Sequence, residues 1–178
     1  LIVSTEEEDK VARFPIATRD SVPEDQREAF DEIVQRLGKV PQYGPESVMI
    51  RVPHAHRWVA GLGNYLRNES TLSRKVQELA MLVTAREMDC QHIWNAHAPT
   101  ARSAGVPASL VDALRDRTEL AAVAPDEEAV VNLGQEFFRT HKVSPSAFQA
   151  ALDQFGERGV VELTMTMVVK FGLTLLLL

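Results

Sequence analysis

The segment QELAMLVTAREMDCQHIWNAHAPTARSAGV, residues 77–106, carries the clearest structural signal in the chain. Residues 72–104 contain no glycine and a single proline, Pro99, so this region predicts a pair of helices. Ser73 is a suitable N-cap for the first helix and Asp89 for the second, because a short side-chain oxygen accepts a hydrogen bond from a free amide at a helix start. We therefore expect two adjacent helices that pack as a hairpin.

The second of these helices has one mostly apolar face that is expected to point inward. Cys90, Ile93, Trp94 and His97 fall at positions i, i+3, i+4 and i+7, which share a helical face. Cys90 and His97 are seven residues apart, which is about 10.5 Å of axial rise in a helix. A direct thiolate–imidazole pair is therefore excluded, and the neighbour of His97 one turn back is Ile93.

The first helix carries Glu78 on an apolar stripe with Leu82 and Ala85. A buried carboxylate needs a partner, and His97 or His92 on the second helix is the expected one. A carboxylate and an imidazole in a dry pocket form a general acid–base pair with adjustable pKa values. The alternative is that Glu78 is solvated at the edge of the stripe.

The spacing of Glu78, Cys90, Ile93 and His97 resembles the core signature of the carboxymuconolactone decarboxylase and alkylhydroperoxidase D superfamily. In the thiol peroxidases of that superfamily, the position of Ile93 is a second cysteine. In the decarboxylase-like members a glutamate is common there. This chain has neither residue, so it keeps the frame of the site but lacks one central group.

Further segments resemble the decarboxylase-like branch. Residues 53–87 look like the part that precedes the active-site helix, and residues 152–169 look like the closing helix. Trp94, with Ala98-Pro99 after His97, also looks more like this branch. The resemblance covers roughly residues 24–175. It implies an all-α, alkylhydroperoxidase D-like helical domain that forms homo-oligomers, either trimers or hexamers.

The function that the resemblance implies is a cofactor-independent, carboxymuconolactone decarboxylase-like lyase acting on a small carboxylated lactone or a related enolisable acid. His97 would be the general acid or base, and Glu78 would orient it or share its proton. Cys90 is the third candidate catalytic residue, and with His92 it would line the pocket. Trp94 would pack against the substrate or the neighbouring helix. No cofactor is expected.

Three further residues are candidate substrate contacts. Ile93 occupies the place of the missing central group, and Arg86 could anchor a substrate carboxylate or form a surface salt bridge. Of His54 and His56, one is expected at the pocket mouth, and we choose His56. These two histidines diverge by about 200° on a helical wheel, so they do not form a metal pair, and no metal is expected.

Two alternatives from other functional classes stay open. The first is a thiol-dependent, alkyl hydroperoxidase-like redox protein that uses Cys90 with an external thiol. It conflicts with the need of a peroxidatic thiol for a nearby base and a resolving partner. The second is a diverged, non-catalytic subunit that binds a small molecule or serves in an assembly. A reactive thiol would favour the first alternative, and a perturbed histidine would favour acid–base catalysis.

Composition limits the partners and the compartment. The net charge is −6 and there is no basic cluster, which argues against nucleic acid and anionic membrane surfaces as partners. The single cysteine excludes an intrachain disulfide and fits a reducing cytoplasm, where we expect the protein. Charged residues at 162 and 170 interrupt the apolar C-terminal run, so residues 160–178 predict a helix covered by protein rather than a membrane span.

The remaining elements follow from turn residues and apolar periodicity. We expect an extended arm over residues 1–20 and one helical domain over residues 21–178. No strand alternation is visible. The predicted order is a helix ending at Gly38, a loop over 39–52, a helix from Pro53, the central pair, short helices near 108–116 and 126–140, and a helix from Ser144.

Overall fold

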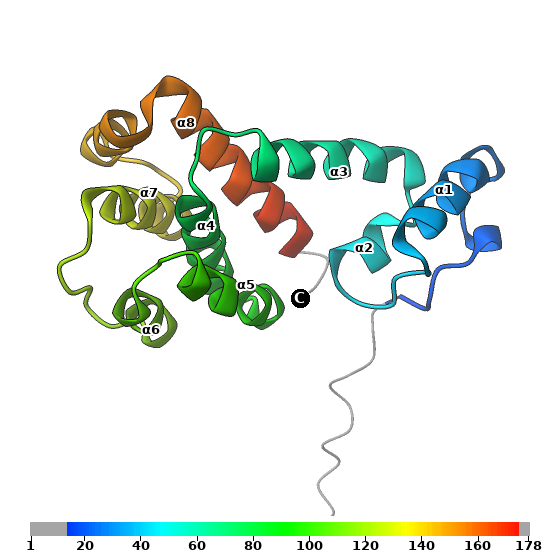
Figure 1. The fold of residues 1–178 in the computed structure, drawn as a ribbon, viewed down its shortest axis with the longest axis horizontal. Coiled ribbons are helices and arrows are strands. Elements are labelled where there is room, and N and C mark those ends of the chain that lie inside the picture. The colour runs from blue at the N-terminus through cyan, green and yellow to red at the C-terminus, as the bar shows by residue number, and fades with distance from the viewer. Residues whose placement is uncertain (1–13, 175–178) are drawn as a thin grey trace, which may run out of the picture. The chain divides into compact units, whose positions relative to one another are not determined.

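The computed structural model describes residues 14–174, with side chains described through Val169, and every regular element in that range is a helix (Figure 1). The predicted all-α class is confirmed. The chain divides into two compact units, one up to Trp58 and one from Val59 onward. The predicted division into an arm over 1–20 and a domain over 21–178 stays a prediction.

The first unit is small and has its own core. Its elements are two 3₁₀ turns, Arg19–Ser21 and Glu24–Gln26, followed by α1 (Arg27–Leu37) and α2 (Gly44–Met49). Gly38 ends α1 in the left-handed region, with φ of 72°, as its position predicts. The predicted loop over 39–52 is wrong in part, because Pro45 does not break the chain there. It lies in the first turn of α2, where its fixed φ suits a helix.

The second unit is built around one buried helix. The chain continues along α3 (Pro53–Asn68), which begins in the first unit, into α4 (Arg74–Glu87) and α5 (Gln91–Ser103). It then forms α6 (Ala108–Asp116), α7 (Pro125–Thr140) and α8 (Pro145–Thr174). Helix α4 contacts α5, α6, α7 and α8, and its residues 76–85 are all buried (Figure 1). The polar side chains among residues 76–85 are therefore held away from water.

The ends of the central pair are only partly as predicted. Ser73 is the N-cap of α4, and its side chain accepts a hydrogen bond from the Val76 amide. Asp89 does not cap α5. It adopts φ of 51°, and Cys90 is the N-cap instead. Aspartate tolerates this left-handed conformation, which lets the chain reverse between two helices within a few residues.

Helix α8 is covered along one face and exposed along the other. It is broken at Gly156, where φ is 66°, and beyond the break Val160, Leu163 and Met167 are buried. The exposed apolar side chains on the same segment are Val161, Met165 and Val168. The expectation that Leu173, Leu175 and Leu176 are covered falls outside the described side chains. The predicted homo-oligomer stays a prediction. Within residues 14–174, no helix has the length and apolar character that a membrane span needs.

Gly134 lets α7 approach α4 closely and gives a first prediction. A Cβ atom at this position would lie 2.6 Å from Cγ1 of Val83 and 3.1 Å from Cε of Met167. We expect Gly134→Ala to lower the free energy of unfolding by about 1–2 kcal/mol, because overpacking outweighs the better helix propensity of alanine. Urea unfolding monitored by circular dichroism measures this change.

Gly61 in α3 is the matched control. A Cβ atom there meets nothing within 4 Å. Gly61→Ala should therefore keep or raise the free energy of unfolding by up to about 1 kcal/mol. Equal unfolding midpoints for the two variants would mean that Gly134 is not tightly packed.

Candidate functional site

Glu78 and His97 form a hydrogen-bonded pair between α4 and α5. Nδ1 of His97 lies 2.8 Å from Oε2 of Glu78. The Glu78 side chain is 0% exposed and that of His97 is 15% exposed. The predicted convergence of these two residues is confirmed, and the partner of Glu78 is His97 and not His92, which is exposed on α5. A buried carboxylate thus holds an imidazole that solvent can reach.

Arg74 is a second partner of Glu78. Arg74 lies one helical turn before Glu78 on α4, and its Nη2 is 2.6 Å from Oε1 of Glu78. Burial alone would raise the pKa of Glu78. The hydrogen bond from His97, with the charges of His97, Arg74 and Arg67, outweighs burial and holds the pKa below 4.5. Glu78 is therefore ionised at neutral pH.

The ionised state of Glu78 fixes which nitrogen of His97 is free to react. An ionised carboxylate only accepts hydrogen bonds. Nδ1 of His97 must therefore carry a proton and donate a hydrogen bond to Glu78. In neutral imidazole the other nitrogen, Nε2, is then an acceptor, and in the charged form it is a donor. Nε2 of His97 can consequently take up or deliver one proton while Nδ1 stays bound.

Glu162 on α8 is also buried, but its surroundings are different. It accepts hydrogen bonds from the hydroxyl of Tyr65 at 2.6 Å, from the amide and hydroxyl of Thr71 at 2.8 and 2.6 Å, and from Nε of Arg158 at 2.9 Å. Burial opposes its ionisation, yet these bonds lower the pKa of Glu162 to about 2. Both oxygens are occupied by groups that fix α8 to α3 and to the loop before α4. Glu162 is therefore a structural carboxylate.

Cys90 lies in a separate place from the Glu78–His97 pair. It is 2% exposed and borders a cavity of about 20 Å³ with two other predicted site residues, Arg86 and Trp94. A cavity of this size holds about one water molecule and has no space for a lactone. The cavity does not include Glu78 or His97. Five of the predicted site residues thus form two separate groups, Glu78 with His97 and Cys90 with Arg86 and Trp94.

The other predicted residues of α4 and α5 are placed less favourably for substrate contact. Ile93 is 3% exposed and packs in the main core, one turn before His97. Arg86 lies eight residues from Glu78 on α4, about 12 Å of axial rise. Its Nη1 is 3.7 Å from Oδ1 of Asp89. Because Arg86 is this far from the Glu78–His97 pair, a small substrate held at His97 would be anchored better by another residue.

His56 belongs to the first unit. It is 2% exposed, and its Nε2 contacts Oε2 of Glu46. Nδ1 of His56 is buried, and no described residue forms a hydrogen bond with it. Such a buried imidazole offers a substrate little access, and its role in substrate binding stays a prediction. Within residues 14–174, no three histidine, cysteine or acidic side chains are grouped as a metal site would require.

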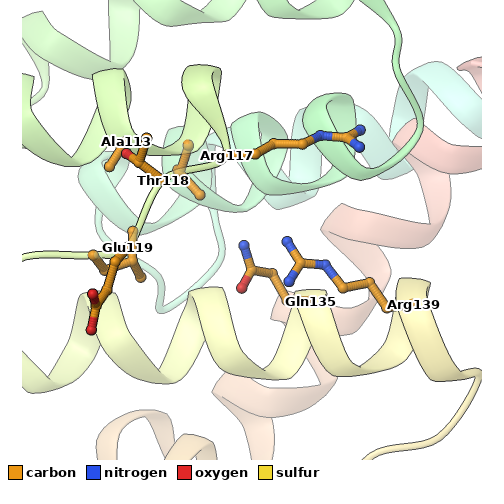
Figure 2. Close-up of a pocket in the computed structure, with 8 residues that line it drawn as sticks. Ala113, Arg117, Thr118, Glu119, Gln135 and Arg139 are labelled. Carbon is orange, nitrogen blue, oxygen red and sulfur yellow. The ribbon is translucent and has the colours of Figure 1, made fainter.

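A larger cavity of about 320 Å³ lies where the α6–α7 connection meets α7, and sequence reasoning missed it. Figure 2 shows Gln135 and Arg139 projecting from α7, with Arg117 and Thr118 on the opposite side. Arg139 forms two hydrogen bonds with Glu87, at 2.8 and 2.7 Å, and Arg117 contacts Asp89. No motif marks this cavity, because its residues come from the end of α6, the connection that follows it and α7. The charges of both arginines are already neutralised.

Comparisons with known proteins agree with the geometry. The structure is similar to a crystal structure described as an alkylhydroperoxidase AhpD core, an uncharacterized peroxidase-related protein from Ralstonia eutropha JMP134. The TM-score is 0.66 at 19% sequence identity, over 91% of this chain and 85% of that one. The model of the carboxymuconolactone decarboxylase family matches residues 53–136, from the start of α3 into α7. The chain thus has an alkylhydroperoxidase D-like fold, and its residues 53–136 resemble the carboxymuconolactone decarboxylase family.

The structural likeness confirms the predicted alkylhydroperoxidase D-like fold. The matched residues include Glu78, Cys90 and His97, so the whole frame of the predicted site lies inside the family region. No curated protein sequence matches this chain significantly. The assignment to the decarboxylase-like branch stays a prediction, because members of one fold differ in their chemistry.

Proposed function

We propose that this protein is a cofactor-independent, decarboxylase-type lyase acting on a small carboxylated lactone or a related enolisable acid. The observation that supports this proposal is the 2.8 Å hydrogen bond between Nδ1 of His97 and Oε2 of Glu78. It joins a fully buried carboxylate to an imidazole that is 15% exposed. Such a pair supplies one proton at a defined atom and needs no cofactor to do so.

His97 would act at the carbon that loses CO₂. The carbon–carbon bond to the substrate carboxylate breaks, CO₂ leaves, and the electron pair passes into the conjugated carbonyl group as an enolate. Nε2 of the charged imidazole then gives its proton to that carbon, and water restores the proton to His97. Glu78 stabilises the imidazolium before the transfer and keeps the ring oriented throughout.

Assays on small acids test this proposal. The purified protein is incubated in D₂O with carboxylated lactones and β-keto acids, and both CO₂ release and deuterium at the former carboxyl-bearing carbon are followed. The proposal expects both signals from the same substrate. Turnover with a hydroperoxide and an added dithiol, without CO₂ release from any acid, would point to redox chemistry.

The role of Cys90 gives a second prediction. Because its thiol is 2% exposed and lies away from the Glu78–His97 pair, Cys90→Ser should keep kcat/KM for the acid substrate within about threefold of wild type. The native thiol should also react slowly with a disulfide reagent and fully after unfolding. A Cys90→Ser variant without activity, measured in the same assay, would replace the acid–base proposal by a thiol mechanism.

A further inference from the structure

The buried oxygen Oε1 of Glu78 is an unusual feature of the site. The side chain is 0% exposed, and no described residue donates an aligned hydrogen bond to Oε1. The only ion pair that the described residues give this oxygen is with Arg74, whose Nη2 is 2.6 Å away. The other oxygen, Oε2, is bound by His97. The carboxylate therefore lies between a guanidinium and an imidazole.

We propose that Arg74 is a positioning residue for His97. Through Glu78, it maintains the ionised carboxylate that holds the Nδ1–H form of His97, and so leaves Nε2 as the nitrogen that exchanges protons. Arg74 acts through another residue and is not itself catalytic. The effect on turnover rests on the proposed function, but the proton position on His97 is a property of the resting protein.

The physical reason lies in the cost of a buried charge. A carboxylate without a nearby cation in an apolar setting takes up a proton or changes position. A protonated Glu78 could donate a hydrogen bond as well as accept one, so it would no longer select one nitrogen of His97. Arg74 prevents this at low cost, because its side chain is 40% exposed and stays partly hydrated.

The charged groups that act on Glu78 come from three helices. Arg74 lies on α4 itself, His97 lies on α5, and Arg67 lies near the end of α3. All three lower the pKa of Glu78. Arg67 acts by charge alone, whereas Arg74 is also in ion-pair contact. Removing Arg74 should therefore raise the pKa of Glu78 even though Arg67 remains.

The chain contains a matched control for this arrangement. Arg158 and Glu162 on α8 repeat the same i, i+4 spacing, with 2.9 Å between Nε and Oε1 and a carboxylate side chain that is 3% exposed. Glu162 is also held by Tyr65 and Thr71, and it has no bond to His97. Arg158→Gln thus removes an equivalent charge from a buried glutamate and leaves the site untouched.

The test is nitrogen-detected NMR of the histidine rings in the full chain, with the His97 signals assigned from a His97→Gln variant. In Arg74→Gln the ratio of the Nε2–H to the Nδ1–H form should rise roughly tenfold, which corresponds to about 1.4 kcal/mol between the two forms. The carboxyl carbon of Glu78 should titrate at higher pH. Arg74→Lys should restore most of the Nδ1–H form, and Arg158→Gln should match wild type.

Several results would overturn the proposal. These are an unchanged ratio in folded Arg74→Gln, an equal change in Arg158→Gln, or an Arg74→Lys variant no closer to wild type than Arg74→Gln. Arg74→Met is a second charge-free variant of similar length. It replaces Arg74→Gln in the NMR experiment if the glutamine variant does not fold. If the ratio shifts as expected but no acid is decarboxylated, Arg74 still positions His97 and only the proposed function fails.

Discussion

We expect His97→Ala to abolish nearly all turnover of the acid substrate under the proposed function, with a loss in kcat of about 10²–10⁴-fold, the range for removal of a general acid or base. The reason is that Nε2 of His97 is the nitrogen left free by the 2.8 Å bond of Nδ1 to Glu78. The fold should survive, because Arg74 remains as an ion-pair partner of the buried Glu78 carboxylate. Steady-state CO₂ release and circular dichroism measure the two properties.

Glu78→Gln is the companion to this substitution. Glutamine keeps the size of the side chain, but its neutral amide no longer stabilises a charged imidazole on His97. We expect a smaller loss, about 10–10²-fold in kcat. The acidic limb of the pH dependence of kcat should also no longer reflect the lowered pKa of Glu78. The control is Cys90→Ser, which should retain activity. A His97→Ala variant with more than a third of the wild-type kcat would remove His97 from the mechanism.

The local part of this site could be predicted from sequence. Helical spacing put Glu78 on the inward face of one helix and His97 on the inward face of the next, and Ser73 marked where the first helix begins. These patterns depend on interactions within a few residues, where 3.6-residue periodicity and capping rules apply. Arg74 was also within reach of this reasoning, because it lies four residues before Glu78 and such pairs face each other on a helix.

Features that depend on tertiary packing were missed or misjudged. Asp89 has the composition of an N-cap, but the tight reversal between α4 and α5 requires its left-handed backbone, and its carboxylate contacts Arg117 instead. Cys90 and His97 share a helical face, yet the structure assigns them to different surroundings. Glu162 was visible only as an interruption of an apolar run, because two of its three partners, Tyr65 and Thr71, are more than 90 residues away in sequence.

Glu162→Ala should be the most destabilising substitution described for this protein. It removes four hydrogen bonds, and it leaves Tyr65 and Thr71 without the acceptor that joins them to α8. We expect the free energy of unfolding to fall by about 3–5 kcal/mol at pH 7, the range for breaking a buried charged network. Arg158→Gln should cost only about 1 kcal/mol, because the arginine is 60% exposed and returns to water.

The pH dependence separates the charge of Glu162 from its shape. Its pKa is depressed to about 2 in the folded protein, so its stabilising effect is complete above the usual value of 4.5 and is lost as the pH falls toward 2. Glu162→Gln keeps the shape and cannot titrate. The difference in unfolding free energy between wild type and Glu162→Gln should therefore shrink across this window. Urea unfolding at pH 7, 4 and 2.5 measures it, and a constant difference would mean that the carboxylate charge contributes nothing to holding α8 in place.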